Sequence, residues 1–162
     1  MRRLLLMVLL AGATLLTSGC TVISVGQMGI GVDGSGGPVA YLQVCSDHID
    51  GAKLYQSDKT FGQWKSSPPV TDFATWSLVT PTGSWSTETP LADLVPGQGY
   101  IIYGGTSDNS ASATYVEFDP ADLATMRPGQ VRYADHYDTA TDQEIWAVGT
   151  EAEFRKAACR RQ

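Results

Sequence analysis

Positive charge is scarce in this chain. Its 162 residues contain 11 lysines and arginines against 17 aspartates and glutamates, a formal net charge of −6, and no basic cluster is longer than Arg160-Arg161. Proteins that bind nucleic acid carry a basic patch or stripe that neutralises phosphates. The composition therefore argues against a nucleic-acid partner.

Motifs of common catalytic and nucleotide-binding sites are also missing. No GxSxG surrounds a serine, no Gly-Lys-Ser/Thr follows a glycine-rich loop, and no CxxC pair is present. The glycine-rich segment 26–37 does not lead from a strand into a helix, as a dinucleotide-binding loop must. We therefore expect neither a cofactor nor an enzymatic activity.

No hydrophobic run is long enough to span a bilayer, since a spanning helix needs roughly 20 apolar residues. The run Leu4 to Leu16 is shorter, and it follows two arginines and leads through small residues to Cys20. It resembles a bacterial lipoprotein signal peptide, although Thr17 stands where that motif usually has Leu, Val or Ile. The resemblance implies removal of residues 1–19 and lipidation of Cys20. The alternatives are ordinary secretion with Cys20 left as a thiol and an uncleaved membrane anchor.

Cleavage at this point leaves one domain of 143 residues, 20–162, which is enough chain to bury a core. It removes two of the 11 basic residues, so nine remain against 17 acidic ones and the formal charge becomes −8. An acidic domain gains little from anionic lipid, so attachment would depend on the acyl chains. We expect a lipid-anchored protein on the extracytoplasmic face of the cell membrane.

Two cysteines, Cys45 and Cys159, remain if Cys20 is acylated. In an exported chain such a pair predicts one disulfide. The bond would close a loop of more than a hundred residues, which contributes about 4–5 kcal/mol in the chain-entropy model. A metal site or catalytic thiol is the competing interpretation, but neither cysteine has a histidine at metal-ligand spacing.

Alternation of apolar and polar residues predicts a mainly β domain. Asp50-Gly51 is a candidate tight turn, and Pro68-Pro69 predicts a loop because proline cannot donate to a sheet ladder. Strands are expected near residues 22–32, 38–45, 52–57, 73–80, 100–105, 114–119, 130–134 and 143–149, with a helical turn beginning near Pro120.

One segment, "LADLVPGQGYIIYGG", carries a more specific signal. Its Leu94, Pro96, Gly97 and Tyr100 resemble the tyrosine corner of fibronectin type III and related immunoglobulin-like domains. The resemblance covers about residues 38–119 and implies a Greek-key β-sandwich. It also implies that the Tyr100 ring is buried and that its hydroxyl bonds to backbone near Leu94.

The end of the chain, "TEAEFRKAACRRQ", predicts a short helix. Thr150 and Glu153 have the spacing of a capping box, and acidic residues precede basic ones, as the helix dipole favours. The predicted fold is thus an immunoglobulin-like or fibronectin-like sandwich whose C-terminal helix is pinned to the strand ending at Cys45.

The whole chain is also similar to small uncharacterised secreted lipoproteins of actinobacteria. The matching stretches are "GVDGSGGPVAYLQVC", "YVEFDPADLATMRPGQVRY" and "EAEFRKAAC". This resemblance implies a cell-envelope setting and no particular activity.

Two histidines each lie beside aspartates, His48 in "SDHID" and His136 in "ADHYD". If the two loops met, these residues could form a zinc site. The acidic cluster Asp135, Asp138, Asp142 and Glu144 lacks the spacing of a calcium-binding EF-hand loop. We interpret both groups as polar loop residues.

Four tryptophans raise the possibility of carbohydrate binding, because exposed indoles stack on sugar rings. Trp64 and Trp85 lie in turn-rich contexts and are the candidate exposed pair among the four, although packing under a loop is the more common fate of such a residue.

These observations favour a non-enzymatic envelope module that binds a cell-wall glycan or an envelope protein. The alternative is a metal-assisted hydrolase that uses His48 and His136.

Overall fold

The computed structural model describes residues 22–160, which form ten strands and two helices. The strands are β1 (Ile23–Val32), β2 (Pro38–Val44), β3 (Ile49–Gln56), β4 (Lys59–Val70), β5 (Phe73–Ser77), β6 (Trp85–Thr89), β7 (Tyr100–Gly105), β8 (Ala111–Phe118), β9 (Gln130–Asp138) and β10 (Gln143–Thr150). The helices are α2 (Pro120–Thr125) and α3 (Glu151–Ala158). The predicted signal peptide and Cys20 lie outside the described residues.

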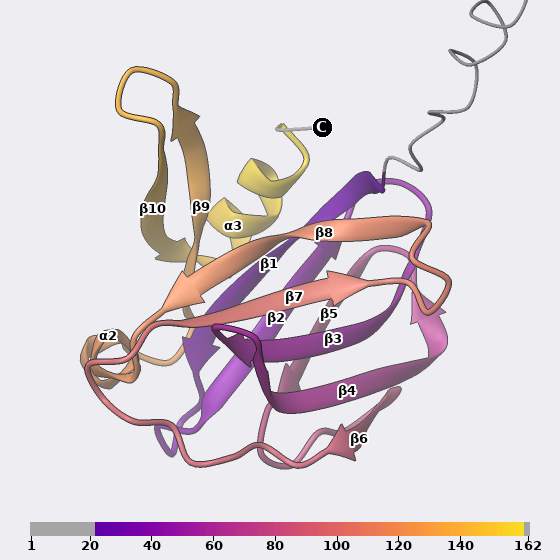
Figure 1. Ribbon diagram of the computed structural model, residues 1–162, viewed down its shortest axis with the longest axis horizontal. Helices are drawn as coiled ribbons and strands as arrows, with labels where there is room; N and C mark the ends of the chain where they lie inside the picture. Colours follow the sequence, from indigo (N-terminus) through magenta and orange to yellow (C-terminus); the bar gives the residue numbers. More distant parts are fainter. Residues whose placement is uncertain (1–21, 161–162) are drawn as a thin grey trace, which may run out of the picture.

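The expected two-sheet sandwich is wrong. The strands pair in the order β5-β2-β1-β8-β7-β3-β4-β6, which is one mixed sheet of eight strands that curls until it is nearly closed into a barrel. In Figure 1, β8, β7, β3, β4 and β6 succeed one another down one side, and the β9–β10 hairpin projects at the opposite end with α3. Alternating residues predicted β1, β2, β3, β5, β7 and β8 as strands, but β4 and β6 were not predicted. Alternation also does not specify strand partners.

Strand β1 explains much of this topology because it has three partners. One of its edges pairs with β2, and its other edge is shared between β8, which runs parallel to it, and β9. Glycines permit the close approach of β9: a Cβ at Gly29 would lie 2.5 Å from Val131 Cγ1, and one at Gly31 would lie 2.3 Å from the Gln130 carbonyl oxygen. A larger residue at either position would push β9 away from the sheet.

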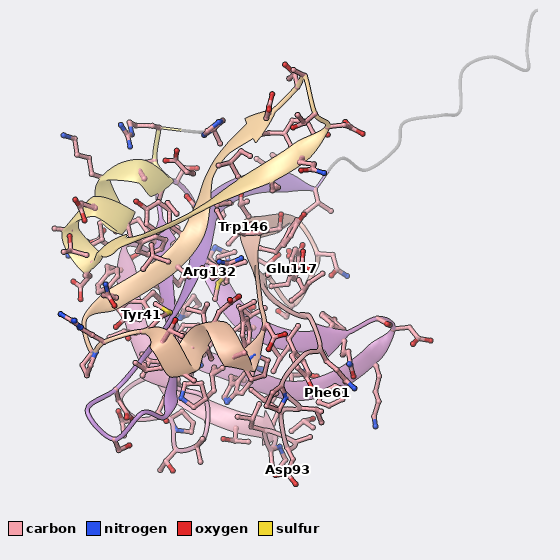
Figure 2. All side chains as sticks on the ribbon, turned by 90° about the vertical axis from the view of Figure 1, so that its left-hand side faces the viewer. Tyr41, Phe61, Asp93, Glu117, Arg132 and Trp146 are labelled. Carbon is pink, nitrogen blue, oxygen red and sulfur yellow. A yellow bond between two sulfur atoms is a disulfide. The ribbon has the colours of Figure 1, made fainter. Side chains whose placement is uncertain are left out.

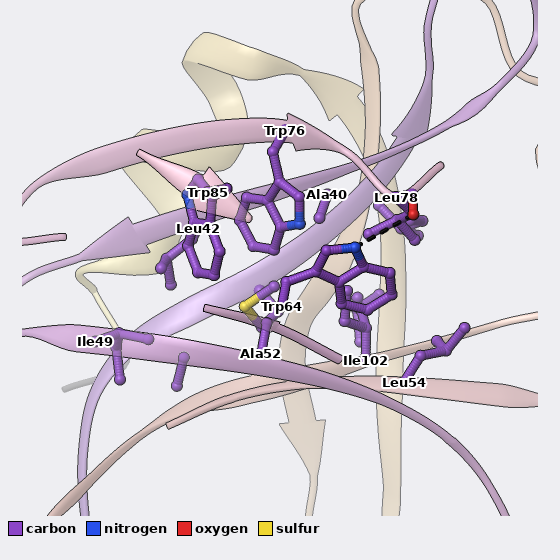
Figure 3. Close-up of a cluster of buried hydrophobic side chains, with 14 of the residues drawn as sticks. Ala40, Leu42, Ile49, Ala52, Leu54, Trp64, Trp76, Leu78, Trp85 and Ile102 are labelled. Atoms are coloured by element: carbon purple, nitrogen blue, oxygen red, sulfur yellow. Dashed lines mark hydrogen bonds between the residues drawn. The ribbon is translucent and has the colours of Figure 1, made fainter. Parts of the chain in front are cut away.

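The barrel seam lies between β5 and β6, and aromatic side chains close it. Trp76 of β5 stacks on Trp85 of β6, with ring centroids 3.7 Å apart and planes 13° from parallel. Trp64 of β4 packs beside them and donates a hydrogen bond from Nε1 to the Leu78 carbonyl, 3.2 Å (Figure 3). All three indoles are buried. Packing of apolar rings therefore replaces the backbone ladder at this junction.

The predicted environment of Tyr100 is confirmed, although the fold around it differs. The ring is fully buried, against Phe61 and Phe118. Its hydroxyl oxygen accepts a hydrogen bond of 3.0 Å from the backbone N–H of Val95. The hydrogen bond between Val95 and Tyr100 thus holds the segment that leads into β7, and this tyrosine corner occurs here in a curled sheet rather than in a sandwich.

Replacing Tyr100 by phenylalanine is expected to lower the free energy of unfolding by about 1 kcal/mol, because the Val95 N–H loses its partner. Urea unfolding measures the difference, and Tyr103→Phe, which alters an outward-facing ring of the same strand, serves as the control. An unchanged midpoint for Tyr100→Phe would show that the corner does not contribute to stability.

The β9–β10 hairpin is held to the barrel by Arg132 on β9. The Arg132 Nε donates to the Glu117 carbonyl at 2.8 Å, and its guanidinium lies 5.3 Å from the Trp146 ring centroid (Figure 2). Helix α3 follows with the predicted capping box between Thr150 and Glu153. Its buried face is Phe154, Ala157 and Ala158.

The predicted disulfide between Cys45 and Cys159 is present, and the Cα atoms are 5.5 Å apart. Disulfides of this kind form in oxidising, extracytoplasmic compartments. Within residues 22–160, neither helix is long and apolar enough to cross a membrane.

Candidate functional site

The two tryptophans expected to be exposed are buried. Trp64 has 0% of its surface accessible and Trp85 has 4%. The segment around Trp64 is not a loop, because it continues as strand β4 through Pro68 and Pro69. Gly62, Trp64 and Ser66 face the core, and the residues between them face outward. The prediction of an exposed tryptophan pair is therefore wrong, and these indoles serve the core.

The two histidines lie on different elements. His48, in the β2–β3 connection, has its Nδ1 2.7 Å from Asp47 Oδ1, and His136, on β9, has its Nδ1 3.0 Å from Asp135 Oδ2. Each histidine is thus hydrogen-bonded to its own neighbour in sequence. Within residues 22–160, no group of three or more His, Cys, Asp or Glu is placed to hold a metal ion.

Local hydrogen bonds engage the acidic residues of the β9–β10 turn. Asp138 accepts from the Ala140 N–H at 2.9 Å and from the Thr141 hydroxyl at 2.8 Å, and these bonds lower its pKa. Asp142 accepts from the Tyr137 hydroxyl. These carboxylates shape the turn of the hairpin.

A different feature stands out on the outer face of the sheet, a groove of about 400 Å³ over β3, β4, β6 and β7. This volume lies within the range of small-molecule sites. The side chains that border the groove come from all four strands: Lys53 and Tyr55 from β3, Gln63 and Lys65 from β4, Glu88 from β6, and Tyr103 from β7.

The floor of the groove is open because two glycines face each other there. Gly51 of β3 pairs directly with Gly105 of β7, and both lie on the outer face. A Cβ built on Gly51 would meet only the carbonyl oxygens of Gly105 and Trp64, at 3.6 and 3.7 Å. These are ordinary contact distances, so the missing side chain leaves a hollow rather than relieving a clash.

The β7–β8 connection forms one wall, and hydrogen bonds within it and to Asp50 of β3 fix its shape. Asp50 accepts hydrogen bonds from the N–H and the hydroxyl of Ser107, at 2.8 and 2.9 Å. Asp108 accepts from the hydroxyl and the N–H of Ser110, at 2.7 and 3.0 Å. The Ser110 hydroxyl above all lowers the Asp108 pKa from 3.8 to about 2. This stabilisation is present above pH 3.8 and is lost as the pH falls through about 2.

The other borders combine aromatic and polar groups. The Tyr103 ring lies along its strand over Gly105: a Cβ built on Gly105 would be 3.1 Å from Tyr103 Cε1. Gln63 Nε2 donates to Glu88 Oε2 at 2.5 Å. The groove therefore offers ring faces, amide groups and charges on a rigid sheet, which suits an extended polar ligand.

A second hollow of about 270 Å³ lies between α2 and the hairpin and is bordered by Arg132 and Asp122. Arg132 is already engaged there: it bonds to the Glu117 carbonyl, lies over Trp146, and has its Nη1 3.9 Å from Asp122 Oδ2. These contacts show that Arg132 holds the hairpin against β8 and α2 and leave it little capacity to bind a ligand. The groove over β3, β4, β6 and β7 is therefore the better candidate site.

Sequence patterns did not reveal the groove. Asp50-Gly51 was interpretable as a tight turn, but the pair lies inside β3, where Asp50 anchors the β7–β8 connection and Gly51 forms the floor. A signal existed in the glycines at both Gly51 and Gly105, since glycine inside a strand often marks a place of close backbone approach. Their direct pairing could be recognised only once the register was known.

Comparison of the chain with protein-family models, with curated proteins and with solved structures finds no match.

Proposed function

We propose that the protein is a lipid-anchored, non-enzymatic module of the cell envelope that binds a cell-wall glycan in the groove over β3, β4, β6 and β7. One observation carries this proposal: two tyrosines, an amide and charged groups surround a hollow whose floor lacks side chains. Aromatic rings stack on sugar rings, and amide and carboxylate groups exchange hydrogen bonds with sugar hydroxyls.

The disulfide supports the extracytoplasmic setting, because such bonds persist outside the reducing cytosol. Rigid strands support a binding role, since sites on strands hold their side chains in place before a ligand arrives.

Filling the floor tests the proposal. In Gly51→Val the new side chain projects into the hollow while the backbone keeps an ordinary strand conformation, and valine favours strands. Thermal stability should be unchanged or slightly higher. Cosedimentation of the purified protein with protein-free cell walls should weaken roughly tenfold or more, which corresponds to about 1.4 kcal/mol.

A second variant removes the ring that leans over the floor. Tyr103→Ala should weaken cosedimentation as Gly51→Val does, whereas Tyr137→Ala, which removes an exposed ring on the distant hairpin, should not. Wild-type retention by both groove variants, or no retention of the wild-type protein itself, would contradict glycan binding in the groove.

The lipid anchor has its own test. Cys20→Ala in the full chain removes the thiol that would be acylated, so the protein should leave the membrane fraction for the medium or accumulate as uncleaved precursor. Membrane fractionation and the mass of the product distinguish these outcomes. A processed Cys20→Ala protein that stays in the membrane would rule out anchoring through this residue.

A further inference from the structure

The groove has a charge opposite to that of the chain. The protein is acidic, with a formal net charge of −6, yet three of its four lysines lie on the β3–β4 hairpin: Lys53, Lys59 and Lys65. Two of them, Lys53 and Lys65, border the groove, where the one acidic side chain at the border is Glu88. A concentration of lysines on one hairpin of an acidic protein indicates that the groove beside it prefers an anionic ligand.

The two groove lysines are diagonal neighbours on one face of the sheet. Lys65 pairs with Gly51, two residues from Lys53. Diagonal neighbours lie roughly 7–8 Å apart, which is within joint reach of one anionic group for two long side chains. On one side of this diagonal lies the open floor at Gly51, and on the other lies Gln63, which pairs with Lys53.

Neither lysine is neutralised by the described part of the protein. No carboxylate of residues 22–160 lies within 4.0 Å of either ammonium group, and both side chains are exposed. The nearby carboxylates already have donors of their own: Ser107 donates to Asp50, and Gln63 donates to Glu88. The lysines therefore remain available to a ligand.

The ring of Tyr103 lies next to this charge. Tyr103 of β7 is directly opposite Lys53 of β3, so ring and ammonium belong to one cross-strand pair, which separates Cβ atoms by about 5 Å. A sugar that carries its own carboxylate can stack on the ring and reach the lysine at the same time. A neutral sugar uses only the ring, and a phosphate polymer without rings uses only the lysines.

We propose that the ligand of the groove is a polysaccharide of acidic, carboxylate-bearing sugars, bound by Lys53 and Lys65 through the carboxylate and by Tyr103 through the ring. This inference rests on the proposed glycan-binding function and names its ligand class.

The test compares matched polymers on the purified protein. Polygalacturonate, alginate and hyaluronate are each titrated beside the same polymer after carboxyl reduction, which keeps the rings and removes the charge. At least one acidic polymer should bind, and its reduced form should bind roughly tenfold more weakly or worse. Binding should also weaken with added salt, because exposed charges are screened.

Lysine variants test which side chains bind the carboxylate of the polymer. The double variant Lys53→Gln, Lys65→Gln should lose roughly tenfold or more in affinity for the acidic polymer. The control Lys156→Gln removes an exposed lysine from α3 and should leave affinity unchanged. The melting temperature should stay constant in both, because none of these side chains is buried.

Three outcomes would overturn the inference. Equal binding of acidic and reduced polymers would leave glycan binding standing and refute the acidic ligand. Equally tight binding of inorganic polyphosphate would show that charge suffices without a sugar ring. Failure of every acidic polymer to bind would refute the ligand class. The proposed function itself is refuted by a different result, wild-type retention on cell walls by both groove variants or no retention of the wild-type protein.

Discussion

Removing the Cys45–Cys159 disulfide is expected to lower the free energy of unfolding by about 4–5 kcal/mol. The bond joins residues 114 positions apart, so it closes most of the domain into one loop and restricts the unfolded chain strongly. The double variant Cys45→Ser, Cys159→Ser, compared with the wild type by urea unfolding without reductant, measures the effect.

The native contacts of α3 determine whether the helix remains docked after the bond is lost. Phe154 is fully buried, and Arg155 donates from Nε to Gln43 Oε1 at 3.1 Å while its guanidinium lies 4.4 Å from the Phe73 ring centroid. We therefore expect the variant to remain folded with α3 in place, at lower stability. The wild type with reductant is the control and should match the variant. A loss under about 1 kcal/mol would show that the unfolded chain is already compact.

Truncating the central indole, Trp64→Ala, is expected to cost about 3–5 kcal/mol. The side chain is fully buried at the seam, so its loss opens a cavity beside Trp76 and leaves the Leu78 carbonyl without its donor. Urea unfolding gives the loss directly.

Two further substitutions separate these effects. Trp64→Phe keeps part of the volume but not the donor and should cost about 1–3 kcal/mol, which stays measurable even if the alanine variant fails to fold. Val79→Ala, at a residue that is 62% exposed, should change stability by less than about 0.5 kcal/mol. A Trp64→Ala variant as stable as Val79→Ala would contradict the seam described above.

Local chemistry made several elements predictable from the sequence. The capping box at Thr150 and Glu153, the buried face of α3 and the corner at Tyr100 all depend on residues close together in the chain. The disulfide followed from the cysteine count. The architecture was not predictable in this way, because paired residues such as Gly29 of β1 and Tyr133 of β9 lie more than a hundred residues apart. Alternating strands and the corner at Tyr100 did not distinguish a sandwich from a curled sheet.

The candidate site, like the sheet architecture, was not predicted from the sequence. Sequence reasoning favoured Trp64 and Trp85 as ligand contacts because their surroundings are rich in turn residues. In the structure β4 continues through both prolines and Trp64 points inward, and the rings at the groove are the half-buried Tyr55 and Tyr103. The groove depends on the register that sets Gly51 opposite Gly105 and Lys65, and register is a property of paired strands rather than of any one segment.

The divided edge of β1 also sets the order in which the domain can form. Its pairing with β2 involves nearby residues. On the other edge, Ile23 pairs with Ala111 and Gly29 pairs with Tyr133, and both partners are synthesised much later. Until those residues emerge, one edge of a largely buried strand has no partner, and such edges are prone to wrong pairing. Contacts of this span also slow folding. A nascent chain of this protein therefore exposes one unpaired edge of β1 until its last third has been made.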